Sequence, residues 1–98
     1  GGTNIYPQEI DDVLLAHQSV AEVCCIGVPN EEWGEEVKAV INLESGADED
    51  AVRKELVQLA EEKLSGFKKP KTYEFWTEEL PRLPTGKIQR NLVKKRFW

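Results

Sequence analysis

Apolar residues recur along the chain at two different spacings, and each spacing predicts a type of element. Over Gln8–His17 the apolar residues Ile10, Val13 and Leu14 lie three or four positions apart, which is typical of an amphipathic helix. Pro7 fits the first turn of such a helix, because its missing N–H would have no partner there. The sequence therefore predicts a helix near its amino-terminal end.

Two further helices are predicted later in the chain. After a break at Ser45–Ala47, apolar residues at helical spacing predict a long helix, which Asp48 or Asp50 can cap through a side-chain oxygen. Its apolar stripe consists of Val52, Leu56, Leu59 and Leu64. Near the carboxy-terminal end, the segment Ile88–Phe97 is rich in Lys and Arg and predicts a short basic helix.

Three segments have the composition of β-strands. Val20–Val28 and Glu36–Leu43 are rich in β-branched residues and flank a short loop, which predicts a hairpin. Thr72–Trp76 alternates well enough to form a third strand. The resulting order is helix, strand, strand, helix, strand, helix. It predicts an α+β fold, a small two-layer domain in which a short three-stranded sheet is covered by helices.

Length and composition indicate one folded domain that spans residues 1–98. Ordinary domains have about 100–200 residues, and the 40% apolar content is enough for one core. No apolar run approaches the roughly 18 residues of a membrane span, and no signal peptide is recognisable. The adjacent Cys24 and Cys25 cannot form a disulfide framework. We therefore expect a cytoplasmic protein without a membrane span, either processed or cut from a longer chain because it lacks Met.

The net charge of −5 is divided unevenly along the chain. Residues 1–64 carry 15 acidic and 4 basic side chains, whereas residues 65–98 carry 3 acidic and 9 basic ones. A division of this kind indicates a basic surface that faces an anionic partner. Composition alone favours the other interpretation, in which a basic tail packs against an acidic body.

The usual catalytic residues are absent or isolated. The single histidine, His17, has no paired Ser or Cys nucleophile in view, so we expect a surface or capping residue. Cys24 and Cys25 point to opposite faces of their predicted strand, and we expect at least one to be a small buried apolar residue. The carboxylates fall in loops and in first turns of helices, where we expect them to be solvated.

One candidate functional motif is the segment Pro84–Arg90. Gly86 lets the backbone turn tightly, and Lys87 beyond it carries a compact cation on a long flexible stem. Such a lysine can reach into a partner's site and meet a phosphate or a developing negative charge. The motif lacks the residue spacing of a P-loop, so we expect no nucleotide binding by this domain unaided.

A second candidate is the loop Gly66–Lys71, in which Phe67 precedes three lysines around a proline. An aromatic face beside cations can hold a nucleotide through stacking and phosphate contacts. A solvated loop with a buried phenylalanine is the alternative interpretation. A third candidate is Trp33 in an acidic hairpin loop, which can cover the edge of the core or stack on a base.

Together these motifs resemble the carboxy-terminal domain of acyl-CoA synthetases, which belong to the adenylate-forming, AMP-binding superfamily. The resemblance covers essentially the whole chain. It rests on Gly1–Ile10 and Leu83–Arg90, joined by Gly27–Pro29, Trp33–Gly34 and Phe67–Pro70. Enzymes of this family activate a carboxylate with ATP and Mg²⁺ to an acyl-adenylate and then transfer the acyl group to the thiol of coenzyme A.

The resemblance implies that this domain is a mobile lid with two poses. In the first pose, Lys87 is catalytic: it enters the active site of a larger amino-terminal domain and neutralises charge as the carboxylate attacks the α-phosphate. In the second pose Lys87 withdraws, and Gly1 and Gly2 line the path of the pantetheine arm. Glycines suit such a path because a side chain would narrow it.

The resemblance also implies a binding site for coenzyme A. The positions that match Trp33 and Phe67 lie beside the adenine of CoA in ligases of this kind. Those that match Lys69 and Lys71 lie near its phosphates. No metal site is expected on this chain, since ATP and Mg²⁺ are bound mainly by the larger domain.

The expected partners are the amino-terminal domain of the same enzyme, a small carboxylic acid and CoA. Because the larger domain holds the ATP-binding loops and the acyl pocket, we expect this chain alone to be inactive. Two alternatives remain open: an adenylation domain that delivers to a carrier protein, or a non-enzymatic anion- or nucleic-acid-binding module formed by residues 65–98. A pI near 4.9 and the lack of a groove-reading helix argue against nucleic acid.

Overall fold

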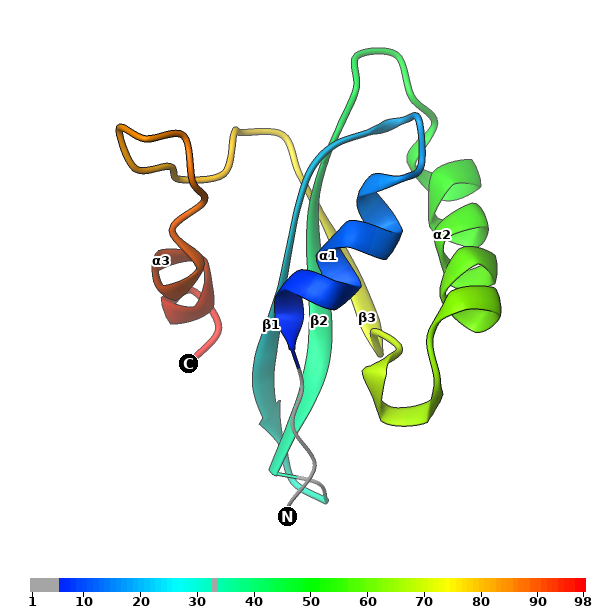
Figure 1. Ribbon diagram of the computed structural model, residues 1–98, viewed down its shortest axis with the longest axis vertical. Coiled ribbons are helices and arrows are strands. Elements are labelled where there is room, and N and C mark those ends of the chain that lie inside the picture. Colours follow the sequence, from blue (N-terminus) through cyan, green and yellow to red (C-terminus); the bar gives the residue numbers. More distant parts are fainter. Residues whose placement is uncertain (1–5, 33) are drawn as a thin grey trace.

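Two long antiparallel strands form the centre of the molecule, and the other elements pack around them (Figure 1). The computed structural model describes residues 6–32 and 34–98. Its elements are α1 (Pro7–Leu15), β1 (Val20–Asn30), β2 (Gly34–Leu43), α2 (Glu49–Lys63), a 3-10 turn (Gly66–Lys68), β3 (Thr72–Trp76) and α3 (Arg90–Lys95). In the sheet order β1-β2-β3, the β1–β2 pair is antiparallel and the β2–β3 pair is parallel. The parallel pair requires a crossover connection, which contains α2.

Local sequence signals fix the starts of the two longer helices. Pro7 occupies the first turn of α1, where its missing N–H leaves no hydrogen bond unmade. At the start of α2, the side chain of Asp48 accepts a hydrogen bond from the N–H of Asp50 at 3.1 Å. Of the two predicted caps, Asp48 is therefore the one that acts.

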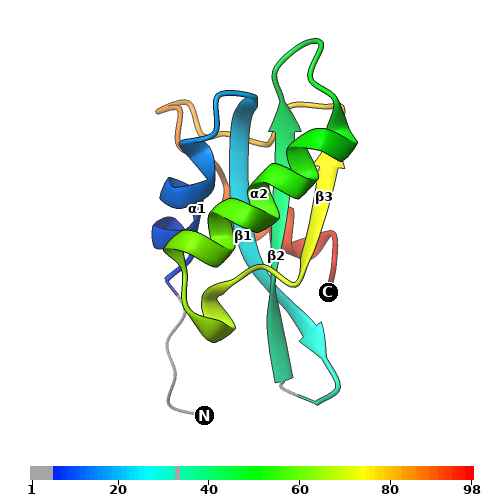
Figure 2. The same cartoon turned by 90° about the vertical axis from the view of Figure 1, so that its right-hand side faces the viewer.

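The sheet buries both of its faces. α1 and α2 cover one face, and α3 covers the other (Figure 1, Figure 2). The core under α1 and α2 includes Ile10, Leu14, Val37, Ile41, Val52 and Leu56. The smaller core under α3 includes Ile26, Val28, Val40, Leu80 and Val93. Cys25 lies in the larger core and Cys24 in the smaller one, which confirms their predicted opposite orientations.

The predicted α+β class is confirmed, since a short three-stranded sheet is covered by helices and β3 has the predicted bounds. The helices form a layer on each face rather than the single helical layer predicted, because α3 covers the second core. β1 and β2 extend further than predicted, because their backbones stay paired up to Asn30 and Gly34. The last helix is shorter than predicted and begins at Arg90, because Ile88 pairs with Arg82 in a β-bridge. No helix in the described ranges is long and apolar enough to cross a membrane.

Candidate functional site

Lys87 lies at the end of a tight turn that includes Pro84 and Gly86. The N–H of Gly86 donates to the carbonyl of Leu83 at 2.8 Å, and the N–H of Leu83 donates to the carbonyl of Lys87 at 2.7 Å. Gly86 has φ 94°, a left-handed conformation that favours glycine. These bonds form the pattern of a three-residue hairpin loop closed by a glycine bulge. The backbone that carries Lys87 is therefore well defined.

The side chain of Lys87 is exposed. Within residues 6–32 and 34–98, its ammonium forms no ion pair and no hydrogen bond. It lines an open cleft together with Leu15 of α1 and with Arg82 and Ile88 of its own segment. A cation in this position is free to meet an anion that another molecule or domain supplies.

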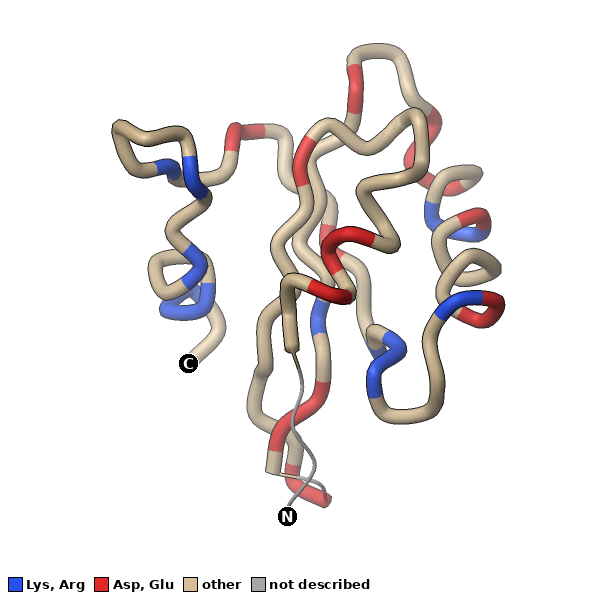
Figure 3. Tube along the Cα trace, in the orientation of Figure 1, with Lys and Arg blue, Asp and Glu red and all other residues tan. Residues whose placement is uncertain are grey.

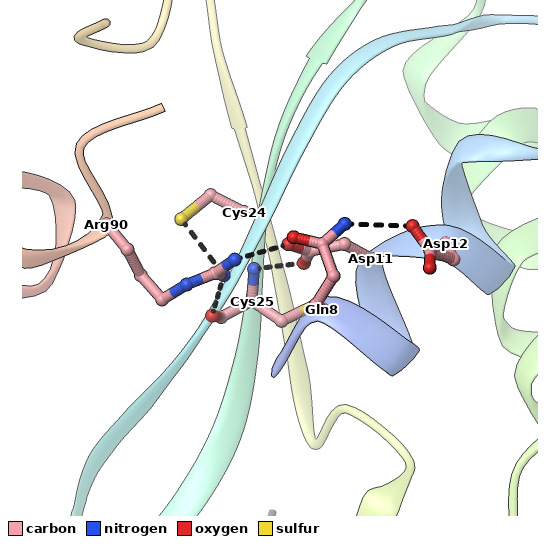
Figure 4. A network of polar contacts seen from close by, with 6 residues as sticks. All are labelled: Gln8, Asp11, Asp12, Cys24, Cys25 and Arg90. Atoms are coloured by element: carbon pink, nitrogen blue, oxygen red, sulfur yellow. Dashed lines mark hydrogen bonds and ion pairs between the residues drawn. The ribbon is translucent and has the colours of Figure 1, made fainter. Parts of the chain in front are cut away.

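On one side of the turn, a buried carboxylate fixes Arg90 (Figure 4). The side chain of Asp11 is 7% exposed, and its Oδ2 accepts from Nη2 of Arg90 at 2.8 Å. The N–H of Cys25 donates to Oδ1 of Asp11 at 2.7 Å, and Nη1 of Arg90 donates to the carbonyl of Cys25 at 2.7 Å. Burial lowers the pKa of Arg90, but the hydrogen bond and charge of Asp11 outweigh burial and raise it. A charged pair therefore joins α1, β1 and α3.

On the other side of the turn, Glu22 of β1 holds Arg82. The side chain of Glu22 is 10% exposed, and its Oε2 accepts from Nη2 of Arg82 at 2.7 Å and from Nε at 2.8 Å. The prediction that the carboxylates are solvated is wrong for Asp11 and Glu22, because each is buried against a backbone N–H and an arginine. The Lys87 turn is thus tied to β1 before the lysine, through Arg82, and to α1 and β1 after the lysine, through Arg90.

The two thiols and the histidine have structural roles. Burial raises the pKa of the Cys24 thiol to about 11 and raises that of Cys25 well above its ordinary value. Both thiols are therefore protonated near neutral pH and are poor nucleophiles. Nδ1 of His17 accepts from the N–H of Ser19 at 3.0 Å, and its Nε2 lies 2.6 Å from Oε1 of Glu55. The imidazole of His17 therefore links the loop after α1 to α2, and the C-cap of α1 is Ala16.

The loop after α2 presents an aromatic ring at the surface. Phe67 is 46% exposed, so the alternative of a buried phenylalanine is wrong. Pro70 is buried, and the N–H of Lys71 donates to the carbonyl of Val37 at 2.8 Å. These contacts fix the loop against β2, and the side chains of Phe67 and Lys71 both remain accessible from outside.

Most cations of residues 65–98 pair with carboxylates, as the interpretation of a basic tail on an acidic body predicts. Besides the buried partners of Arg82 and Arg90, four salt bridges lie nearer the surface. They are Lys68–Glu9 (3.1 Å), Lys69–Glu61 (2.8 Å), Lys94–Glu35 (3.8 Å) and Arg96–Glu78 (3.7 Å). In the part of the chain that the structure describes, Lys71, Lys87 and Lys95 have no such partner. Two of these three cations belong to the motifs recognised in the sequence.

The two motifs lie at opposite ends of the molecule. In both ribbon views the turn at residues 82–88 (orange) lies in the upper part, and the loop at residues 66–71 (yellow-green) lies in the lower half (Figure 1, Figure 2). Figure 3 shows basic segments at both places. The structure therefore does not bring Lys87 together with Phe67 and Lys71 in one site.

Three of the predicted site residues, Gly1, Gly2 and Trp33, lie outside the described residues. The end of β1 and the start of β2 lie in the lower half of the molecule, as does the 66–71 loop (Figure 2). Among the residues described, no group of three or more His, Cys, Asp or Glu could hold a metal ion.

The fold is that of the carboxy-terminal domain of adenylate-forming enzymes. The chain belongs to the AMP-binding enzyme C-terminal domain family, whose sequence model matches residues 9–87. It is 40% identical over 97 residues to the fatty acid–[acyl-carrier-protein] ligase ScoC of Streptomyces coeruleorubidus. It is 43% identical over 90 residues to the long-chain-fatty-acid–CoA ligase of Bacillus subtilis. The solved structure of the anthranilate CoA ligase AuaEII with anthranoyl-AMP has a TM-score of 0.89 at 33% identity.

These matches cover nearly all of this chain but only part of each relative. They span 99%, 92% and 99% of the chain, and 18%, 16% and 19% of ScoC, the Bacillus ligase and AuaEII, respectively. The resemblance stated from the motifs is thereby confirmed at the level of the family. The roles of Lys87, Phe67, Lys69 and Lys71 stay predictions.

Replacing Asp11 by alanine should destabilise the 98-residue chain far more than breaking an exposed ion pair. The substitution leaves Arg90 and the N–H of Cys25 without their buried acceptor, which should lower the free energy of unfolding by about 3 kcal/mol. Glu49→Ala is the matched control, because Glu49 pairs with Arg53 at an exposed site and should lose about 0.5 kcal/mol. Urea unfolding measures both values. Equal losses in the free energy of unfolding would contradict a structural role of the buried Asp11–Arg90 pair.

Proposed function

We propose that this chain is the mobile carboxy-terminal domain of an ATP-dependent carboxylate–CoA ligase, with Lys87 as its catalytic residue. The observation that carries the proposal is an exposed ammonium without a partner in the described residues, on a turn held by two buried carboxylates. A free cation on a fixed base is suited to enter a site built elsewhere. The relatives are ligases several times longer than this chain, which supports a larger partner domain in the same enzyme.

In the first step, the carboxylate of the acid attacks the α-phosphate of ATP and displaces pyrophosphate, which gives the acyl-adenylate. Both reactants are anionic, so charge repulsion opposes their approach. The ammonium of Lys87 offsets this repulsion and stabilises the negative charge that develops on the phosphoryl oxygens. It also holds the reacting groups in position. In this proposal ATP and Mg²⁺ are bound mainly by the larger domain, so this chain alone is inactive.

In the second step, the thiol of CoA attacks the acyl carbon of the adenylate, and AMP leaves. The opposite end of the domain suits this step, since Phe67 offers a stacking face and Lys71 an unpaired cation. Lys69 is the weaker candidate for a phosphate contact, because it already pairs with Glu61 at 2.8 Å. A rotation of the domain between the two steps would exchange one end for the other at the active site.

A carrier protein is the alternative acceptor, and the similarity to ScoC, a fatty acid–[acyl-carrier-protein] ligase, favours it. A carrier protein presents a pantetheine arm without the adenine nucleotide, so Phe67 and Lys71 would then have no ligand. We favour CoA because an exposed ring and an unpaired cation lie in one loop. Gly1 and Gly2 would line the pantetheine path with either acceptor, whereas Trp33 would contact adenine only with CoA.

Lys87→Ala in the full-length enzyme should slow acyl-adenylate formation by about 100-fold, the usual effect of removing one charge-stabilising donor. Thioester formation from preformed acyl-adenylate should keep its rate, because Lys87 is withdrawn in that step. Pyrophosphate release measures the first step, and thioester yield from added adenylate measures the second. Lys95→Ala is the control, because Lys95 is also exposed and unpaired in the described structure. Equal loss in both steps would contradict the role of Lys87.

Lys71→Glu should raise the KM for CoA about tenfold, which corresponds to ~1.4 kcal/mol of binding free energy. ATP–pyrophosphate exchange should not change. With free pantetheine as the acceptor, which has no nucleotide, wild type and variant should react equally. Lys54→Glu, on the exposed side of α2, is the control for added negative charge.

Three results would contradict this assignment. An unchanged KM for CoA in Lys71→Glu would remove the 66–71 loop from the nucleotide site. An equal defect with pantetheine would indicate a general loss of the second step. An enzyme that acylates a carrier protein but not CoA would favour the alternative acceptor.

A further inference from the structure

The carboxylate of Glu22 receives donors from two different parts of the segment that leads to Lys87. The N–H of Leu80 donates to its Oε1 at 3.0 Å, while Nε and Nη2 of Arg82 both donate to its Oε2. Glu22 lies in β1, next to a register shift between Val20 and Glu22 that breaks the regular pairing with β2. The carboxylate is 10% exposed and is therefore shielded from competing water.

Arg82 connects this carboxylate to the lysine turn. Its Nη1 donates to the carbonyl of Gly86, which belongs to the peptide bond that Gly86 shares with Lys87. Its own carbonyl accepts from Nε2 of Gln89 at 3.2 Å, and its backbone pairs with Ile88 across the turn. One guanidinium thus contacts both Glu22 of β1 and the carbonyl of the peptide bond directly before Lys87.

We propose that Glu22 and Arg82 are positioning residues for Lys87. Glu22 orients the guanidinium of Arg82, and Arg82 fixes the Gly86 carbonyl so that the backbone of Lys87 points its side chain away from the domain. This inference rests on the catalytic role of Lys87 proposed above. It goes beyond that role by assigning a function to two residues that lie outside the Pro84–Arg90 motif.

The physical reason is the sensitivity of the chemical step to the position of the cation. The flexible stem of a lysine on an unsupported loop samples many positions, and misplacement by about 1 Å can reduce a rate about 100-fold. The planar guanidinium of Arg82 has several donors in a fixed fork, so it can bind a carboxylate and a carbonyl at once. An ammonium at the same position is a point charge and cannot reproduce this geometry.

The test is Arg82→Lys in the full-length enzyme, which keeps the positive charge but loses the fork. The kcat of acyl-adenylate formation should fall about tenfold, whereas the KM for ATP and the rate of thioester formation from preformed adenylate should not change. Glu22→Gln should likewise lower the kcat of adenylate formation and leave thioester formation unchanged. The amide has only one acceptor oxygen, so its NH₂ group must face one of the two donors, the N–H of Leu80 or Arg82. If Arg82→Lys fails to fold, Glu22→Gln provides the test of the positioning role.

Arg53→Lys is the matched control. The side chain of Arg53 is 40% exposed, against 43% for Arg82, and it also binds a glutamate, Glu49, and a backbone carbonyl, that of Tyr73. It lies on α2, over the other face of the sheet from α3. If the loss in Arg82→Lys is a general effect of replacing a paired arginine, Arg53→Lys should lower the kcat of adenylate formation equally. If it reflects the positioning of Lys87, Arg53→Lys should leave this kcat unchanged.

A double substitution separates positioning from a merely structural role. If Arg82 acts through Lys87, then Arg82→Lys should have no further effect on adenylate formation in the Lys87→Ala enzyme. A further tenfold loss in that background, or an equal loss in both half-reactions of the single variant, would overturn the positioning role alone. If Lys87→Ala leaves adenylate formation intact, the proposed function itself fails, and the positioning role fails with it.

Discussion

The carboxy-terminal part of the fold depends on two buried carboxylates contributed by the amino-terminal part of the chain. Between β3 and α3 there is no helix or strand longer than a single bridge, and Asp11 and Glu22 provide the acceptors that hold this segment against β1. Pairing with Arg82 and Arg90 offsets the cost of burying these charges without a large net gain in stability. The pairs instead define a geometry, and the Lys87 turn lies between them.

Charge pairing also separates the structural cations from those available to a ligand. Six of the basic residues after residue 64 pair with carboxylates, so the basic character of this part of the chain is mostly neutralised within the domain. Within the described residues, Lys71, Lys87 and Lys95 are left unpaired, and the 66–71 loop lies far from the turn at residues 82–88 (Figure 1). In the proposed function, the turn that carries Lys87 would serve the first step and the 66–71 loop the second.

The helices and strands could be predicted because their signals are local, as with the cap at Asp48 and the bounds of β3. The burial of Asp11 could not, because an acidic residue near a helix start is ordinarily solvated, and only the packing of α1 on β1 encloses it. Glu22 did leave a signal, as a charge within an apolar strand. The motif identified Lys87. Whether a lysine has a partner, however, depends on tertiary contacts that the sequence does not show, as the salt bridge of Lys69 with Glu61 illustrates.

The most direct test of the central claim is the rate at which an amine-acylating reagent labels Lys87 in the full-length enzyme, with and without ATP and the carboxylic acid. Lys95 provides an internal reference, since it is also exposed and unpaired in the described structure. If Lys87 enters the active site during adenylation, the substrates should protect it while the labelling of Lys95 stays constant. If both lysines react at the same rates with and without substrates, Lys87 does not reach the site, and its proposed catalytic role is wrong.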